Sequence, residues 1–215
     1  MALMARMNRE AKKFLTEERR AQVMAAALRL MSKKGFESTS MEDIAEEADL
    51  AKGTVYLYFQ NKEALLREVL ETQTLAPALL PALETINPND PLPVILPKLL
   101  AVLWEALKQR EDAIRMLLRE GSHRTEYSLL LLGRTLPVSE ALTQRLRELV
   151  GPALAPDIDP FIAIRALVSM LLGLFVEQYI LGGKKMRPMS EEAILRTVSG
   201  LFIHGVMDDG AGGVS

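Results

Sequence analysis

Between residues 39 and 62, the spacing of apolar side chains predicts two short helices joined by a tight corner. Over residues 41–48, apolar side chains recur three or four positions apart with acidic side chains between them, as on a helix with one buried face. Over residues 52–59, Val55 and Phe59 lie four positions apart and share one face. We expect the two apolar faces to pack together, which leaves the other faces of the second helix in solvent.

The first helix of this pair carries signals at both ends. The Ser40 hydroxyl can accept a hydrogen bond from the amide of Asp43, three residues on, which is close to a capping box. The helix ends at Asp49, where the helix dipole disfavours a negative charge. We expect Asp49 to adopt a left-handed backbone at the corner, because Asp tolerates that conformation better than most residues.

The second helix has the form of an element that enters the major groove of DNA. Gly53, Thr54 and Leu57 face away from the protein, Lys52 and Tyr56 lie along one flank, and Tyr58 lies along the other. In such a helix the flanking groups reach phosphates and the outer face reaches base edges. Glycine costs about 1 kcal/mol relative to alanine in a helix, so Gly53 indicates that a partner approaches the backbone closely.

The flanking segments predict a scaffold around the pair. A longer helix begins at Thr16, carries Val23 and Ala27 on its buried face, and ends at Gly35. Residues 1–15 are basic and are expected to form a flexible tail, which either stays disordered or touches a neighbouring groove. A fourth helix begins at Lys62, whose ammonium group and free helix amides could anchor a phosphate.

The remaining chain predicts a helical body without strands. Prolines punctuate residues 77–97, which we interpret as a connector with short helical pieces. Helices are expected over 93–109, 111–121, a broken pair spanning 124–150, 159–181 and 190–207, followed by a disordered Gly-rich tail at 208–215. The apolar run Ala166–Val176 has 11 residues, too few to span a bilayer, so no membrane partner is expected.

Composition narrows the chemistry. The chain has no cysteine and two histidines, which argues against disulfides, metal sites and metal cofactors and suits a reducing cytoplasm. The net charge is −2, yet residues 1–62 hold 11 basic and 9 acidic side chains. A slightly basic segment joined to an acidic body is the charge distribution that a small DNA-binding domain requires.

The motifs from Val23 to Leu66 resemble the tetracycline-repressor (TetR) family of bacterial transcription regulators. The resemblance is carried by Ala27, Gly35-Phe36, Thr39-Ser40, Asp43-Ile44-Ala45, Lys52 to Phe59 and Lys62 to Leu65. Two positions depart from the family pattern, since Asp49 stands where the family usually has Gly and Ala51 stands where it usually has Ser or Thr.

This resemblance implies an all-α fold with a three-helix helix-turn-helix head at residues 1–62 and a ligand-binding and dimerisation body at residues 63–207. It implies a sequence-specific regulator, expected to be a repressor, that binds double-stranded operator DNA as a homodimer. The residues implied in DNA binding are Thr39, Ser40, Lys52, Gly53, Thr54, Tyr56, Leu57, Tyr58 and Lys62.

The family habit also implies a small apolar or amphipathic inducer and a dimer formed by residues 159–181 and 190–207. Bulky or polar groups among Leu and Ala are the candidate pocket residues. They are Trp104, Met116, Arg119, His123, Tyr127, Phe175, Gln178 and Tyr179.

Two other classes of function are weighed against this interpretation. An enzyme needs a convergent acid, base or nucleophile, and His123, in Gly-Ser-His-Arg, matches no catalytic motif, so no catalytic residue is predicted. A helical adaptor remains an alternative, but it leaves the groups of residues 52–62 unexplained. The residues alone do not distinguish repression from activation, nor do they identify the inducer or the operator.

Overall fold

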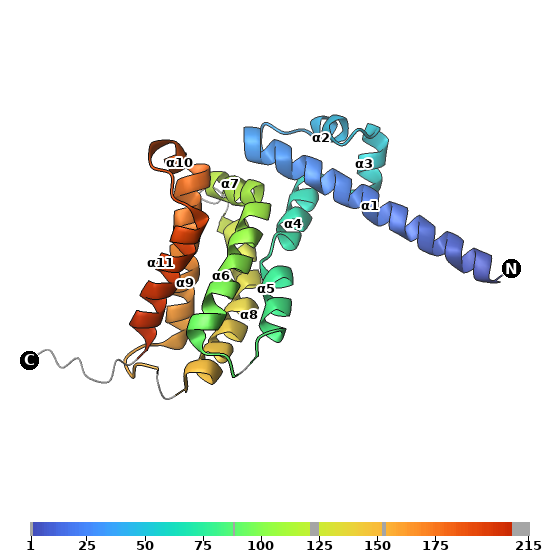
Figure 1. Ribbon diagram of the computed structural model, residues 1–215. Coiled ribbons are helices and arrows are strands. Elements are labelled where there is room, and N and C mark those ends of the chain that lie inside the picture. Colours follow the sequence, from blue (N-terminus) through green and yellow to red (C-terminus); the bar gives the residue numbers. More distant parts are fainter. Residues whose placement is uncertain (1, 88, 121–124, 152–153, 208–215) are drawn as a thin grey trace, which may run out of the picture. The chain divides into compact units, whose positions relative to one another are not determined.

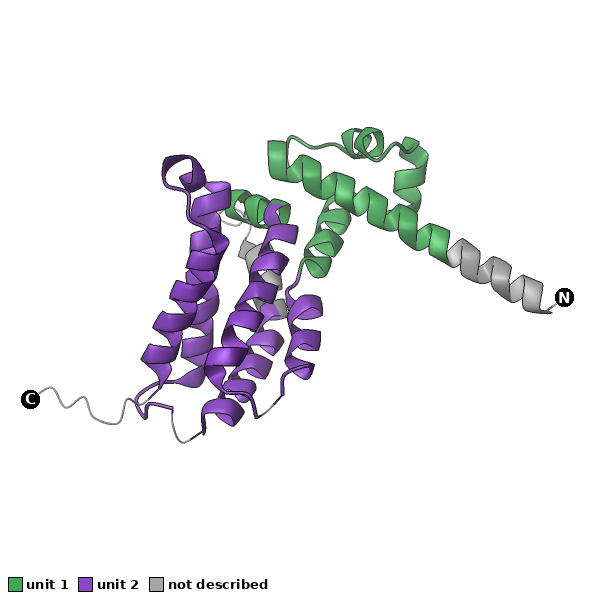
Figure 2. Ribbon diagram, in the orientation of Figure 1, with its two compact units in different colours: residues 1–73, 112–131 green, residues 74–111, 132–215 purple. Residues whose placement is uncertain are grey.

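The computed structural model describes residues 2–87, 89–120, 125–151 and 154–207, and these residues form helices without a named strand (Figure 1). The predicted all-α fold is confirmed. The chain divides into two compact units (Figure 2). Unit 1 comprises residues 1–73 and 112–131, and unit 2 comprises residues 74–111 and 132–215.

Unit 1 contains the predicted helix-turn-helix. Its helices are α1 (Ala2–Lys34), α2 (Met41–Glu47), α3 (Lys52–Tyr58), α4 (Lys62–Thr72) and α7 (Glu111–Glu120, from Asp112 onward). This compact unit is larger than the segment 1–62 inferred as the DNA-binding head, because it includes α4 and a helix from much later in the chain.

The start of α1 differs from the sequence prediction. The helix begins at Ala2, whereas the pattern predicted a flexible tail over residues 1–15 and a helix start at Thr16. The physical reason is composition, because Ala, Leu, Met, Arg, Glu and Lys dominate residues 2–13 and are the strongest helix formers. The exposed side chains of Phe14 and Leu15 continue the helix without joining the core.

The predicted signals around α2 are confirmed. The Ser40 hydroxyl accepts from the Asp43 amide at 3.1 Å, and Asp43 Oδ2 accepts from the Ser40 amide at 2.8 Å, which completes a capping box. Asp49 has a φ of 52°, the left-handed conformation expected at the corner. Ala51 occupies the N-cap of α3 without a side-chain hydrogen bond, as its departure from the family pattern implies.

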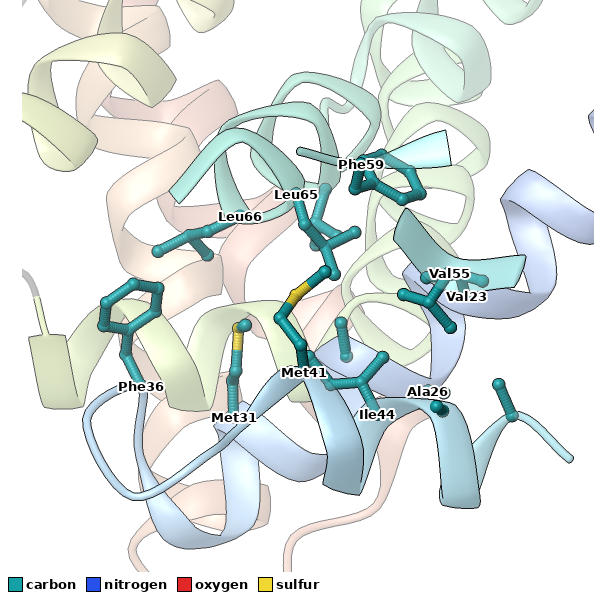
Figure 3. Close-up of a cluster of buried hydrophobic side chains, with 14 of the residues drawn as sticks. Val23, Ala26, Met31, Phe36, Met41, Ile44, Val55, Phe59, Leu65 and Leu66 are labelled. Carbon is teal, nitrogen blue, oxygen red and sulfur yellow. The ribbon is translucent and has the colours of Figure 1, made fainter. Parts of the chain in front are cut away.

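The helices of unit 1 share one apolar core (Figure 3). Val23, Met31, Ile44, Val55 and Leu65 are fully buried in it, so α1, α2, α3 and α4 each contribute a side chain. Helices of seven residues are too short to be stable in water alone. The shared core therefore holds α2 and α3 in place.

Unit 2 is a bundle of helices with a separate core. Its elements are α5 (Ala76–Glu84), α6 (Leu92–Gln109), α8 (Thr125–Val150, from Leu132 onward), α9 (Pro160–Phe175), the π-helix η2 (Val176–Ile180), α10 (Gly183–Met186) and α11 (Glu191–Val206). Helix α6 packs against α5, α9 and α11, and α9 packs against α11 (Figure 1). Leu100, Trp104, Leu171 and Phe175 are buried in this bundle.

The body departs from the predicted elements in one place. The short helical piece expected within residues 77–97 is α5, with Pro81 inside it, and the helix predicted over 93–109 is α6, which includes Pro97. The predicted broken pair over 124–150 is one helix, α8, which runs through Pro137. Proline removes one backbone donor, and the surrounding helical bonds and packing outweigh that loss here.

The run from α9 into η2 is the most apolar stretch of the described chain. Pro160–Ile180 has 21 residues with a mean hydropathy of 1.8, which is long and apolar enough to cross a membrane by length and composition. Core helices of soluble proteins share these properties. Leu171 and Phe175 are fully buried, whereas Ile162 is 65% exposed, so one face of α9 is uncovered in the single chain.

The capping box makes a prediction about acid stability. The Lys34 ammonium and the Ser40 amide lower the pKa of Asp43 from 3.8 to about 2 in the folded chain. This contribution is complete above about pH 4 and is lost as the pH falls through the folded pKa. Asp43→Asn should therefore show a shallower loss of unfolding free energy between pH 4 and pH 2, measured by urea denaturation followed by circular dichroism.

Asp49→Asn is the matched control for this prediction, because it makes the same change at another exposed position of unit 1. If the unfolding free energy of Asp43→Asn fell between pH 4 and pH 2 as steeply as that of the wild type, the Asp43 carboxylate would not contribute to acid stability as predicted.

Candidate nucleic-acid interface

Helix α3 divides its side chains between the core and solvent as the sequence predicted. Val55 is fully buried and Phe59, just after the helix, is 3% exposed, whereas Leu57 is 82% exposed and Tyr56 is 43% exposed. A Cβ added at Gly53 would meet no atom of the chain within 4 Å. Packing within the protein therefore does not select glycine at this position, in keeping with close approach by a partner.

Arg20 of α1 holds the end of α3. Its guanidinium forms a bidentate ion pair with the Glu68 carboxylate on α4, and its Nη1 donates to the Tyr58 carbonyl at 3.2 Å. It also lies 4.6 Å from the centre of the Phe59 ring. The pairing with Glu68 raises the pKa of Arg20. One side chain of α1 therefore connects α4 to the last turn of the candidate recognition helix.

Sequence reasoning did not single out Arg20, although a signal was available. Arg20 lies three and seven residues before Val23 and Ala27, so it falls on the buried face of α1. A charged residue on such a face needs a partner, and the guanidinium fork is suited to a carboxylate.

Lys52, predicted to contact phosphate, is paired within the protein. Its ammonium forms an ion pair with the Glu42 carboxylate on α2, and both side chains are more than half exposed. The ammonium also lies 5.8 Å from the centre of the Tyr56 ring. The hydrogen bond with Lys52 lowers the pKa of Glu42 and raises that of Lys52. A carboxylate thus occupies the position at which a phosphate would meet this lysine.

Two residues predicted to contact DNA have structural roles in the turn between α1 and α2. Thr39 is 1% exposed and its hydroxyl donates to the Gly35 carbonyl at 2.7 Å, so its side chain is too deep to reach a duplex. The Lys62 ammonium donates to the Phe36 carbonyl at 2.7 Å and lies 4.2 Å from the centre of the Phe36 ring. Sequence spacing could not show these contacts, because the partners are distant in the chain or are backbone atoms.

The residues predicted to line a ligand pocket do not form one cluster. In unit 2, the rings of Trp104, Phe175 and Tyr179 contact one another with centroids 4.9 to 5.9 Å apart. Gln178 is buried there and its amide is satisfied by the backbone of Arg187 and Met189. The Tyr179 hydroxyl donates to Glu191 at 2.8 Å, and burial raises the pKa of Tyr179.

The other predicted pocket residues lie elsewhere. Met116 is 2% exposed in the core of unit 1, and Arg119 of α7 donates to the Lys33 carbonyl. Tyr127 lies in α8, and His123 lies outside the described residues. Helix α7 turns the side chains of Met116 and Arg119 toward the helices of unit 1, so neither joins the ring cluster of unit 2, and their role as pocket residues stays a prediction.

An apolar cavity of about 40 Å³ lies inside unit 2, lined by side chains that the sequence reasoning did not select. Its walls include Leu83, Leu96, Leu103, Leu146 and Leu167. Arg145 is the one charged residue in its lining. Two guanidinium nitrogens of Arg145 donate to Glu148 and to the Ile86 carbonyl, whereas Nε is buried without a hydrogen-bond partner. A buried donor of this kind favours an acceptor in the cavity.

Comparison with known proteins agrees with the geometry of unit 1. Residues 23–69 match the family model described as bacterial regulatory proteins, tetR family. The chain is 28% identical over 184 residues to YuxN, a helix-turn-helix transcriptional regulator of Bacillus subtilis; this covers 80% of the chain and 58% of YuxN. It is 25% identical to the Escherichia coli helix-turn-helix transcriptional regulator UidR, over 74% of the chain and 80% of UidR.

A solved structure extends the likeness to the whole fold. The fatty acid degradation regulator FadR from Bacillus halodurans superposes with a TM-score of 0.71 at 20% identity, over 87% of this chain and 95% of FadR. At 20% identity, the superposition shows a similar fold and gives no information on a shared ligand.

The Glu42–Lys52 pair makes a prediction about DNA affinity. Glu42→Gln removes the carboxylate that competes with phosphate for Lys52, so affinity for any duplex should rise about two- to fivefold, the range of an exposed ion pair. Fluorescence anisotropy with a labelled duplex at fixed salt measures this change. Glu46→Gln removes the same charge from an exposed position of α2 and is the matched control. Equal gains in both variants would mean that net charge, and not the pair, sets the affinity.

Proposed function

We propose that this chain, whose residues 23–69 match the tetR family of bacterial regulatory proteins, is a DNA-binding transcriptional regulator of that family. In this proposal it is a homodimeric repressor that a small molecule releases from a palindromic operator. The observation that carries this proposal is the outer face of α3, where Leu57 and Tyr56 are exposed on a helix whose other face is buried. A cytoplasmic location follows from this role.

We assign base contacts to the outer face of α3, at Gly53, Thr54 and Leu57. An exposed leucine suits contact with a thymine methyl group, and a glycine lets the backbone approach base edges. Phosphate contacts are assigned to the flanks and to the starts of α2 and α4. They involve Ser40, Lys52, Tyr56, Tyr58 and Lys62, each of which is at least partly exposed. Lys62 would bind phosphate in addition to its contact with Phe36.

A dimer is supported by an apolar stripe that the single chain leaves uncovered. Ile162, Ala166 and Met170 recur every four residues along α9 beside Leu201 and Gly205 of α11, and together they line an open groove. Leu201 is 63% exposed. A two-fold axis through this stripe would bury it and would present two copies of α3 to two half-sites. Residues 159–181 and 190–207 are thus the proposed dimer helices.

The inducer is proposed to occupy unit 2 within the ligand-binding and dimerisation segment, residues 63–207. The cavity is apolar apart from Arg145, which favours an apolar or amphipathic molecule with one hydrogen-bond acceptor. Its volume of about 40 Å³ is below the roughly 300–1,000 Å³ of a ligand pocket, so the surrounding helices would have to separate to admit an inducer. Such a molecule acts as an inducer only if it prefers the state that does not bind DNA. The ring cluster of Trp104, Phe175 and Tyr179 is the second candidate position.

A charge on the apolar stripe should separate the dimer into monomers. Leu201→Asp should sediment as a folded monomer, because the residue is exposed in the single chain and the burial of an unpaired charge is costly. Selection from random duplexes by the wild-type chain should return a palindrome, with half-sites about 34–36 Å apart or a multiple of this. Leu201→Asp should bind that palindrome at least about tenfold more weakly.

Met186→Asp, at a position that is 91% exposed and outside both proposed dimer segments, is the matched control and should leave both properties unchanged. If the wild-type chain sedimented as a monomer at micromolar concentration, the proposed dimer would be refuted. Wild-type chain that enriches no sequence would argue instead for a helical adaptor.

Ligand and operator should weaken each other's binding by the same factor. A thermal-shift screen of small apolar carboxylates, alcohols and ketones would supply the ligand, which is then titrated with and without the selected palindrome. Operator DNA should lower ligand affinity about 5- to 150-fold. Arg145→Met keeps an apolar stem but removes the donors, so it should bind hydrocarbon analogues as wild type does and acceptor-bearing ligands more weakly. Equal ligand affinity with and without DNA would exclude that compound as an inducer.

A further inference from the structure

Helix α7 belongs to unit 1, the compact unit that holds the DNA-binding head, although it begins about forty residues after the end of α4 (Figure 2). Met116 of α7 is 2% exposed and joins the core formed by Val23, Ile44 and Val55. Leu117 packs partly buried against the same core. The head is therefore built from more helices than the helix-turn-helix and α4 alone.

The polar contacts of α7 converge on one short segment, the end of α1 and the turn after it. Asp112 Oδ1 accepts from the Ser32 hydroxyl at 2.9 Å. Arg119 donates to the Lys33 carbonyl at 2.8 Å, one of the carbonyls that a helix end leaves without an intrahelical partner. Glu120 Oε1 accepts from the Phe36 amide at 3.1 Å.

This turn sets the position of the DNA-reading helices. Gly35 has a φ of 88°, and a Cβ there would lie 3.3 Å from Glu120 Oε1, a tight contact, so the Glu120 carboxylate lies close against the turn. Thr39 and Lys62 bind the carbonyls of Gly35 and Phe36 from within the head. The turn leads directly into the capping box of α2, and α2 leads to α3 through the corner at Asp49.

The entry to α7 is also fixed. A single residue, Arg110, separates the last residue of α6 from the first residue of α7. Its guanidinium donates to the carbonyls of Thr74 and Ala106 at 2.9 Å each. Both hydrogen bonds lie within unit 2 and hold the corner at the end of α6.

We propose that α7 is a positioning element for DNA binding, in which Glu120 and Arg119 hold the turn between α1 and α2 in the geometry that the operator requires. This proposal rests on the DNA-binding function proposed above and adds a second connection to the head beside α4. Glu120 acts as an acceptor for one backbone amide and does not itself contact DNA.

Two substitutions at one position separate this role from a general loss of stability. Glu120→Gln keeps an acceptor oxygen for the Phe36 amide, whereas Glu120→Ala removes it. Leu118→Gln changes an exposed side chain of the same helix and is the matched control. Each full-length variant is compared with wild type for affinity to the selected palindrome, for affinity to a scrambled duplex, and for hydrogen exchange of the Phe36 amide by NMR.

Glu120→Ala should bind the palindrome about tenfold more weakly and exchange the Phe36 amide about tenfold faster, in line with the loss of one hydrogen bond. Binding to the scrambled duplex should change less, since phosphate contacts are kept. Glu120→Gln and Leu118→Gln should resemble wild type. The proposal is overturned if Glu120→Ala binds the palindrome as wild type does, or if Glu120→Gln loses as much affinity while the Phe36 amide stays protected. Wild type that selects no palindrome would refute DNA reading itself, which is a separate outcome.

Discussion

The structure of the head depends on one constraint, which is that its recognition helix is too short to be stable alone. Helix α3 has seven residues, and it has a helical form only because Val55 and Phe59 are buried among α1, α2 and α4. Arg20 ties its last turn to α4, and the turn after α1 sets the direction from which α2 arrives. The contacts of α7 fall on that same turn, at Ser32, Lys33 and Phe36.

The local sequence pattern was sufficient for features that depend on near neighbours in the chain and insufficient for contacts between distant segments. Ser40 with Asp43, the left-handed Asp49 and the burial of Val55 were all predictable, because each depends on neighbours within a few residues. The buried position of Thr39 and the place of Met116 were not, since they depend on which distant helices pack together. Strong helix formers in α1 and tertiary packing around Pro137 in α8 likewise overrode the predicted breaks.

The two units differ in the kinds of side chain on which their candidate sites depend. Unit 1 places charged and aromatic groups around one helix and satisfies its turns with side-chain hydrogen bonds. In unit 2, the buried Gln178 has both ends of its amide bonded to the backbone, whereas the Nε of the partly exposed Arg145 is buried without a hydrogen-bond partner. The DNA-reading residues carry a recognisable motif, whereas a ligand cavity is defined by the absence of atoms between many leucines, which no local pattern records.

The Glu42–Lys52 pair also bears on how fast a regulator finds its site. A protein searching a chromosome spends most of its time on wrong sequences, held by charge alone, and each extra phosphate contact lengthens every such stop. If Lys52 contacts phosphate as proposed, its ion pair with Glu42 would weaken binding to random DNA, and the carboxylate would give way to a phosphate only where the remaining contacts fit. Such an arrangement would exchange some affinity for shorter residence at non-target sites and a quicker search.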